Sequence, residues 1–62
     1  MKSLAQKIAQ LEGLIDTKDV NEKTNGFLLK VCHGVKDRRG NTRWLTPGQI
    51  EWLDDIYERH FA

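Results

Sequence analysis

The fold is decided by one stretch of the sequence, WLTPGQIEWLDDIYERH, which spans residues 44–60. Thr46 suits the N-cap of a helix, Pro47 suits the first helical position, and Gln49 is placed to return a hydrogen bond to the cap. The apolar residues that follow recur at the spacing of one helical face: Ile50, Leu53, Ile56 and Tyr57. The stretch therefore predicts a helix over about residues 46–60.

A second capping pattern stands near the start of the chain, where Ser3 is followed by Gln6. Apolar residues then recur at helical spacing: Leu4, Ile8, Leu11 and Ile15. We predict a helix over about residues 3–15, weakened in its last turn by Gly13. Its apolar face is expected to close a small core. A homodimer through a short coiled coil is the alternative, although the stripe is shorter than the roughly three or four heptads that coiled coils need.

The middle of the chain predicts another helix, over about residues 20–39, with its start between residues 19 and 21. One side of it gathers apolar residues, the last two of them at its margin: Phe27, Leu28, Val31, Val35, Leu29 and Cys32. Gly34 lies near the same side, where a missing side chain would let a neighbouring helix approach. Gly40 is expected to end the helix as a left-handed cap.

The alternative for this region is a β-hairpin, with residues 27–32 and 42–46 as strands around a Gly-Asn turn. Two adjacent leucines break the alternation of the first strand, and an isolated hairpin is marginal in water. We therefore predict an all-α fold, in which residues 1–62 form a single small domain of three helices. Because a short link joins the last two helices, they are expected to form an antiparallel hairpin, covered by the first.

Charge is distributed unevenly along the chain. The ten Lys and Arg residues nearly balance the nine Asp and Glu residues, and the net charge of +1 gives no overall attraction to nucleic acid or to a membrane. Residues 21–45, however, hold six cations against two carboxylates, a net charge of +4. Residues 46–62 hold four carboxylates against one cation, a net charge of −3. Opposite charges are therefore expected on separate surfaces.

The cellular setting follows from what the sequence contains. Cys32 is the single cysteine, which excludes an internal disulfide and favours a reducing compartment. The amino terminus lacks the apolar core of a signal peptide, and no apolar run approaches the ~20 residues of a membrane span. We expect a cytoplasmic protein without a membrane partner.

Residues that could perform chemistry are few. Cys32 and His33 are adjacent, so on a helix they point about 100° apart and cannot form a nucleophile–base pair. A buried structural cysteine beside a solvated histidine is expected instead. One cysteine and two histidines fall short of a zinc site. We therefore predict a protein that is not an enzyme and that uses no cofactor and no metal.

The best candidate for binding nucleic acid is the basic turn, residues 36–44, between the last two predicted helices. Its cations and its indole could contact phosphates and stack on a base: Lys36, Arg38, Arg39, Arg43 and Trp44. The alternative is structural, because cations complement the C-terminal end of a helix and Trp44 could fold into the core.

The candidate surface for a protein partner is the acidic face of the last predicted helix. We define it by a tryptophan and three carboxylates: Trp52, Asp54, Asp55 and Glu58. A half-exposed tryptophan with charged neighbours is typical of an interaction hot spot. The alternatives are that Trp52 covers the core and that the basic second helix balances the carboxylates.

One sequence pattern resembles a known kind of segment. Phe27-Leu28 is followed by Leu45-Thr46-Pro47-x-Gln49-x-x-x-Leu53-x-x-Ile56-Tyr57-Glu58. This pattern, within residues 21–60, resembles a short helical segment that recurs in small uncharacterised bacteriophage proteins. The resemblance implies a phage accessory protein, active near the replication, recombination or transcription of nucleic acid, and assigns no site residue.

The sequence thus favours a small non-enzymatic interaction module, of a phage-type accessory or regulatory kind, that binds a protein partner. The alternative is a nucleic-acid-binding protein that uses the basic turn.

Overall fold

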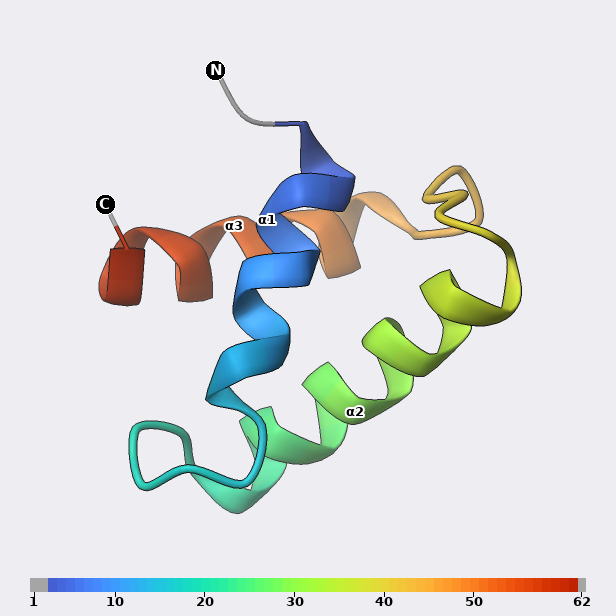
Figure 1. Cartoon of the computed structure of the whole chain (residues 1–62). Helices are drawn as coiled ribbons and strands as arrows, with labels where there is room; N and C mark the ends of the chain where they lie inside the picture. The colour runs from blue at the N-terminus through green and yellow to red at the C-terminus, as the bar shows by residue number, and fades with distance from the viewer. Residues whose placement is uncertain (1–2, 62) are drawn as a thin grey trace.

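The computed structural model describes residues 3–61, and helices are its only regular elements (Figure 1). They follow in the order α1 (Leu4–Leu11), the short 3₁₀ helix η1 (Glu12–Leu14), α2 (Glu22–Asp37) and α3 (Pro47–Phe61). No strand occurs among the described residues, so the predicted all-α fold with three helices is confirmed. The β-hairpin alternative is excluded, because residues 27–32 lie inside α2. Residues 1, 2 and 62 of the predicted domain lie outside the described part.

Side chains close the starts of the three helices as local chemistry requires. At α1 the backbone N–H of Gln6 donates to Ser3 Oγ (3.2 Å), and the backbone N–H of Ser3 donates to Gln6 Oε1 (2.8 Å). The same reciprocal pair joins Thr46 and Gln49 at α3, at 3.2 and 2.9 Å. Asn21 Oδ1 caps α2 and lies within the predicted range for its start. Both predicted capping boxes are therefore confirmed.

The first helix tightens near the glycine that was expected to weaken it. Regular α-helix ends at Leu11, and Gly13 lies in the 3₁₀ turn that follows. The chain then leaves the helix at Ile15, which is extended, and reverses at Asp16, which has a φ of 61°. Asn25 holds this reversal in place, because its Oδ1 accepts from the Asp16 N–H (2.6 Å) and its Nδ2 donates to Asp16 Oδ1 (3.0 Å).

The C-terminal end of α2 differs from the prediction by one residue. The N–H of Arg39 donates to the Lys36 carbonyl (3.1 Å) and the N–H of Gly40 donates to the Val35 carbonyl (2.8 Å), the pattern of a Schellman motif. The left-handed position of this motif is held by Arg39, with a φ of 54°, and Gly40 follows with a φ of 87°. The prediction that Gly40 is the cap is therefore wrong by one position. A side chain in this conformation costs about 1 kcal/mol.

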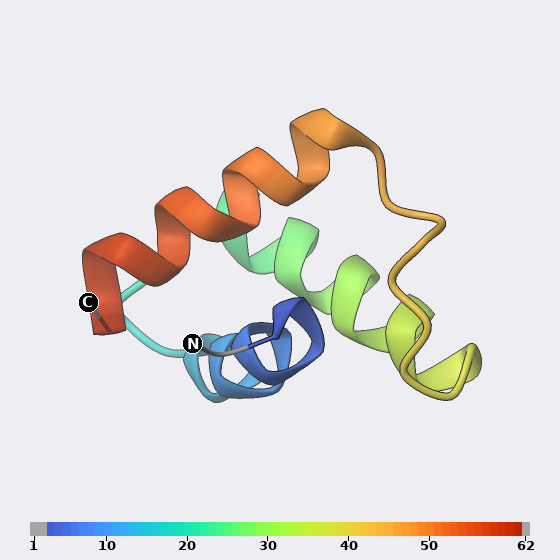
Figure 2. The ribbon, with the colours of Figure 1, turned by 90° about the horizontal axis from the view of Figure 1, so that it is seen from above.

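The core lies where α1 crosses the two longer helices. The backbone of α1 packs closely against both α2 and α3, which are inclined to each other and run in opposing directions in Figure 2. Phe27 of α2 stacks on Trp52 of α3, with ring centroids 3.9 Å apart, in agreement with the hairpin predicted for these helices. Apolar residues from every element form the buried core: Ile8, Leu11, Leu14, Leu28, Val31, Cys32, Val35, Leu45, Leu53 and Ile56. Cys32 lies within this core and not at its margin, where the sequence placed it.

The connection between α2 and α3 is anchored by the indole of Trp44, which fills the space left by Gly34. A Cβ atom on Gly34 would lie 2.7 Å from Cη2 and 2.8 Å from Cζ2 of Trp44. The indole Nε1–H donates to the carbonyl oxygen of Asn41 (2.6 Å). The close approach predicted at Gly34 is confirmed, but the neighbour is a side chain of the connection and not a helix.

Candidate functional site

Three of the five residues predicted to bind nucleic acid are engaged within the chain. Lys36 Nζ lies 2.8 Å from Glu12 Oε2, and both side chains are exposed, so the pair is weak. The guanidinium of Arg38 lies 4.5 Å from the centroid of the Trp44 ring and donates through Nη1 to the carbonyl oxygen of Gly34 (3.1 Å). Trp44 is half-buried as a result. It packs on the fold, as the structural alternative for this residue expected.

The other two residues, Arg39 and Arg43, are exposed on the basic turn. Within residues 3–61, neither side chain has an ion-pair or hydrogen-bond partner. Their backbone is nevertheless fixed, because Arg39 belongs to the Schellman motif and the Arg43 N–H donates to Asn41 Oδ1 (2.9 Å). The turn therefore holds two uncompensated cations on an ordered backbone.

The acidic face predicted to bind a protein is also partly engaged within the fold. Trp52 is half-buried on Phe27, as expected for a residue that covers the edge of the core. Asp54 Oδ1 lies 3.2 Å from Lys7 Nζ, so α1 balances this carboxylate and the prediction that α2 does so is wrong for Asp54. Sequence spacing cannot identify this partner, because Lys7 and Asp54 are 47 positions apart.

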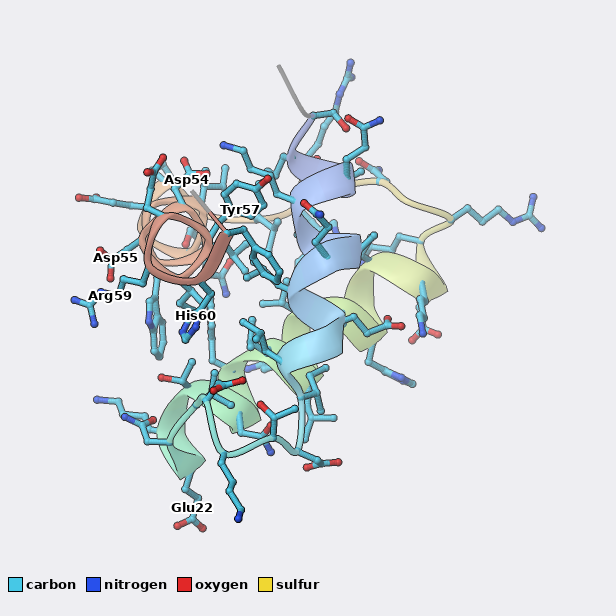
Figure 3. The ribbon with its side chains drawn as sticks, turned by 60° about the vertical axis from the view of Figure 1, so that its left-hand side comes forward. Glu22, Asp54, Asp55, Tyr57, Arg59 and His60 are labelled. Carbon is cyan, nitrogen blue, oxygen red and sulfur yellow. The ribbon has the colours of Figure 1, made fainter. Side chains whose placement is uncertain are left out.

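The remaining two members of the acidic face lie on the solvent side of α3. Asp55 Oδ2 lies 3.2 Å from Arg59 Nε in the next turn, so these two opposite charges attract each other along the helix. Figure 3 shows Asp55 and Arg59 pointing away from α1, whereas Tyr57 points toward it. Glu58 is exposed, and among the described residues its carboxylate has no ion-pair partner. The acidic face is thus divided between two sides of the helix.

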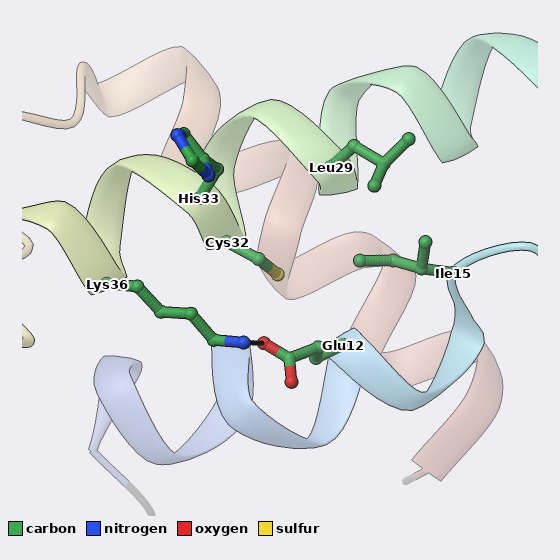
Figure 4. Close-up of a pocket in the computed structure, with 6 residues that line it drawn as sticks. All are labelled: Glu12, Ile15, Leu29, Cys32, His33 and Lys36. Atoms are coloured by element: carbon green, nitrogen blue, oxygen red, sulfur yellow. Dashed lines mark ion pairs between the residues drawn. The ribbon is translucent and has the colours of Figure 1, made fainter.

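Sequence reasoning missed a groove of about 380 Å³ between the η1 segment and α2 (Figure 4). Its walls combine apolar side chains with the ion pair described above: Glu12, Ile15, Leu29, Cys32, His33 and Lys36. Leu29, which does not belong to the buried core, is 46% exposed at the groove. The signal that could have found the groove is the position of Leu29 off the buried stripe of α2.

Cys32 and His33 do not form a nucleophile–base pair. The thiol is buried in the core with Sγ 3.9 Å from the Ile8 carbonyl oxygen, whereas His33 is exposed with Nε2 3.4 Å from Asp37 Oδ2. Burial raises the pKa of the Cys32 thiol, Glu12 raises it further, and Lys36 lowers it. A raised pKa favours the protonated thiol, which is a poor nucleophile. The predicted buried cysteine beside a solvated histidine is confirmed. Among the described residues, no three potential metal ligands gather.

Alkaline pH is expected to destabilise the fold. The pKa of the Lys36 amine is raised by its hydrogen bond to Glu12 and by the charge of that carboxylate, and the pKa of Cys32 is raised mainly by burial. Because both folded pKa values lie above those of the unfolded chain, the unfolded chain releases these protons first. Their contribution to stability is complete at neutral pH and is lost as the pH rises through the folded pKa values.

Urea unfolding across the range from neutral pH to about pH 11 tests this expectation. The free energy of unfolding should begin to fall above about pH 9. Cys32→Ala should lessen this loss of stability in the lower part of the alkaline range, and Glu12→Gln should lessen it in the upper part. A decline that neither variant alters would show that other groups cause it.

Comparison with family models, with curated proteins and with solved structures gave no match for this chain. The resemblance to bacteriophage segments therefore stays an expectation from the sequence. Over the part of the chain that the structure describes, no helix is long and apolar enough to cross a membrane.

Proposed function

We propose that this protein is a small, non-enzymatic interaction module whose basic turn binds nucleic acid, with Arg39 and Arg43 contacting phosphates. The observation that carries this proposal is Arg39 itself. It occupies a left-handed position, with a φ of 54°, where glycine would avoid a cost of about 1 kcal/mol. Its charge has no partner in residues 3–61. An unfavourable backbone position with an unused charge is understandable if the charge acts outside the fold.

The sequence favoured a protein partner, and the structure gives this alternative less support. Three of the four residues of the acidic face have partners within the fold: Trp52, Asp54 and Asp55. The basic turn instead keeps two cations available on an ordered backbone, and Arg side chains suit phosphate because their fork of N–H donors matches its oxygens. An accessory role on nucleic acid also agrees with the resemblance to bacteriophage segments.

The variant Arg39→Gly separates binding from stability. We expect it to raise the free energy of unfolding by about 1 kcal/mol, because glycine relieves the left-handed position. We expect the same variant to weaken binding to a short oligonucleotide about 10-fold at roughly 20 mM salt, because one phosphate contact is lost. Urea unfolding and NMR titration of the backbone amides measure the two effects. Weaker binding by a more stable protein cannot result from unfolding.

The matched control is Lys30→Gln, which removes one positive charge from an exposed site on α2 outside the basic turn. It should leave both stability and binding close to those of the parent protein. Equal weakening by both variants would mean that net charge alone matters and would overturn the proposal. So would the absence of amide shift changes in the basic turn at low salt.

The second candidate is a protein partner at the exposed part of the acidic face, and Glu58 favours it. This carboxylate is exposed and has no ion-pair partner among the described residues. Asp54, which lies one helical turn before it, has the same charge and repels it. A partner captured after nuclease treatment should then be lost with Glu58→Lys and kept with Arg39→Gly. The reverse pattern would exclude this surface.

A further inference from the structure

The groups of the basic turn that could read a base are used inside the fold. The indole of Trp44 has its Nε1–H on the Asn41 carbonyl oxygen (2.6 Å), its ring beside the Arg38 guanidinium (4.5 Å) and its edge against Gly34. The side-chain oxygen of Asn41 accepts from the Arg43 N–H (2.9 Å). The amide oxygen, the indole N–H and the ring face that Arg38 covers are therefore not free for a nucleotide.

Base recognition depends on such groups. Asparagine identifies adenine by a two-point hydrogen bond, and aromatic rings hold single-stranded bases by stacking. The second tryptophan, Trp52, is stacked on Phe27 at the opposite end of α2 and cannot replace Trp44 at the turn. What remains at the turn is a pair of guanidinium groups, and contacts of that kind to phosphates carry no sequence information.

The number of available cations is limited by the fold as well. Lys36 lies one helical turn before Arg39, but its amine is held 2.8 Å from Glu12, and Arg38 is held against Trp44 and the Gly34 carbonyl. Glu12 belongs to η1 and Lys36 to α2, so a carboxylate of one element competes with phosphate for a cation of another. Arg39 and Arg43 are left to act.

We infer that the basic turn recognises the phosphate backbone of nucleic acid irrespective of base, through about two phosphates at a time, and that Glu12 competes with phosphate for Lys36, the third possible contact. This inference rests on the proposed function. Each phosphate contact releases counterions, so the logarithm of the binding constant should fall with the logarithm of salt concentration at a slope of about −1.4 for single strands and about −1.8 for duplexes.

The experiment is an NMR titration of the whole chain with oligo(dA), oligo(dT) and a mixed-sequence duplex of equal length, at several low salt concentrations. Affinities for the two homopolymers should agree within about 3-fold, because stacking and base edges do not contribute. Inorganic tripolyphosphate should displace both. In Glu12→Gln the slope should become steeper by about 0.7 on single strands, since Lys36 joins the contact.

The outcomes separate the inference from the proposed function. A preference of more than about 10-fold for one homopolymer, with shifts in the basic turn, would overturn base-independent recognition and leave nucleic-acid binding intact. An unchanged slope in Glu12→Gln would overturn the role given to Glu12. No binding to any of the three nucleic acids would overturn the proposed function and the inference together.

Discussion

Leu28→Ala is expected to destabilise the protein by about 2–5 kcal/mol, the largest effect of any substitution considered. The Leu28 side chain is fully buried in the core formed by the three helices. Truncation removes buried apolar surface and leaves a cavity that the rigid surroundings fill incompletely. A chain of this size has a total stability of roughly 3–9 kcal/mol, so the variant should lose a large part of its stability. Circular dichroism during urea unfolding measures the loss.

The neighbouring residue supplies the matched control. Leu29 is 46% exposed beside the groove, so Leu29→Ala removes the same atoms from a site that water already reaches. Its expected cost is below about 1 kcal/mol. Equal losses from the two variants would contradict the orientation of α2, in which adjacent leucines point to different environments.

Gly34→Ala is expected to destabilise the protein by about 1–3 kcal/mol, although alanine is normally the better helix former by about 1 kcal/mol. The added methyl group would meet the Trp44 ring at 2.7 and 2.8 Å, closer than carbon atoms can approach. The indole must therefore leave its position against α2, and the turn that it anchors through Asn41 must shift. Urea unfolding gives the loss, and near-ultraviolet circular dichroism reports the displaced indole.

Gly26 provides the opposite result in the same helix. It is exposed, and no atom lies within 4 Å of a Cβ built on it. Gly26→Ala should therefore stabilise the protein by up to about 1 kcal/mol. Replacing Trp44 by leucine should make Gly34→Ala much less costly, because the clash is removed. Stabilisation by Gly34→Ala in the parent protein would show that the indole does not occupy this space.

The positions of the helix starts could be predicted because capping is local. Ser3 with Gln6, and Thr46 with Gln49, form their reciprocal bonds across three residues, so the sequence contains both partners in one short window. The end of α2 was harder to predict. A left-handed cap favours glycine, which pointed to Gly40, whereas the hydrogen-bond pattern of the complete structure places Arg39 there.

The sequence predicted which types of residue form the candidate sites, but not which of their side chains remain free. Spacing identified the cations of the basic turn and the carboxylates of the acidic face. It could not show that Glu12 holds Lys36, that Arg38 covers Trp44, or that Lys7 holds Asp54. Each of these contacts joins a residue to a partner whose position depends on helix packing or on the path of the turn.

The sequence by itself determined the three helices, the capping boxes of the first and the last, and the apolar faces that form the core, because these depend on interactions within about four residues along the chain. Tertiary structure alone decided which polar and aromatic groups remain free. The Lys36–Glu12 and Lys7–Asp54 ion pairs and the Phe27–Trp52 stack join elements that are distant in sequence. These partners become neighbours only when apolar burial fixes where α1, α2 and α3 cross. That packing leaves Arg39 and Arg43 without partners among the described residues.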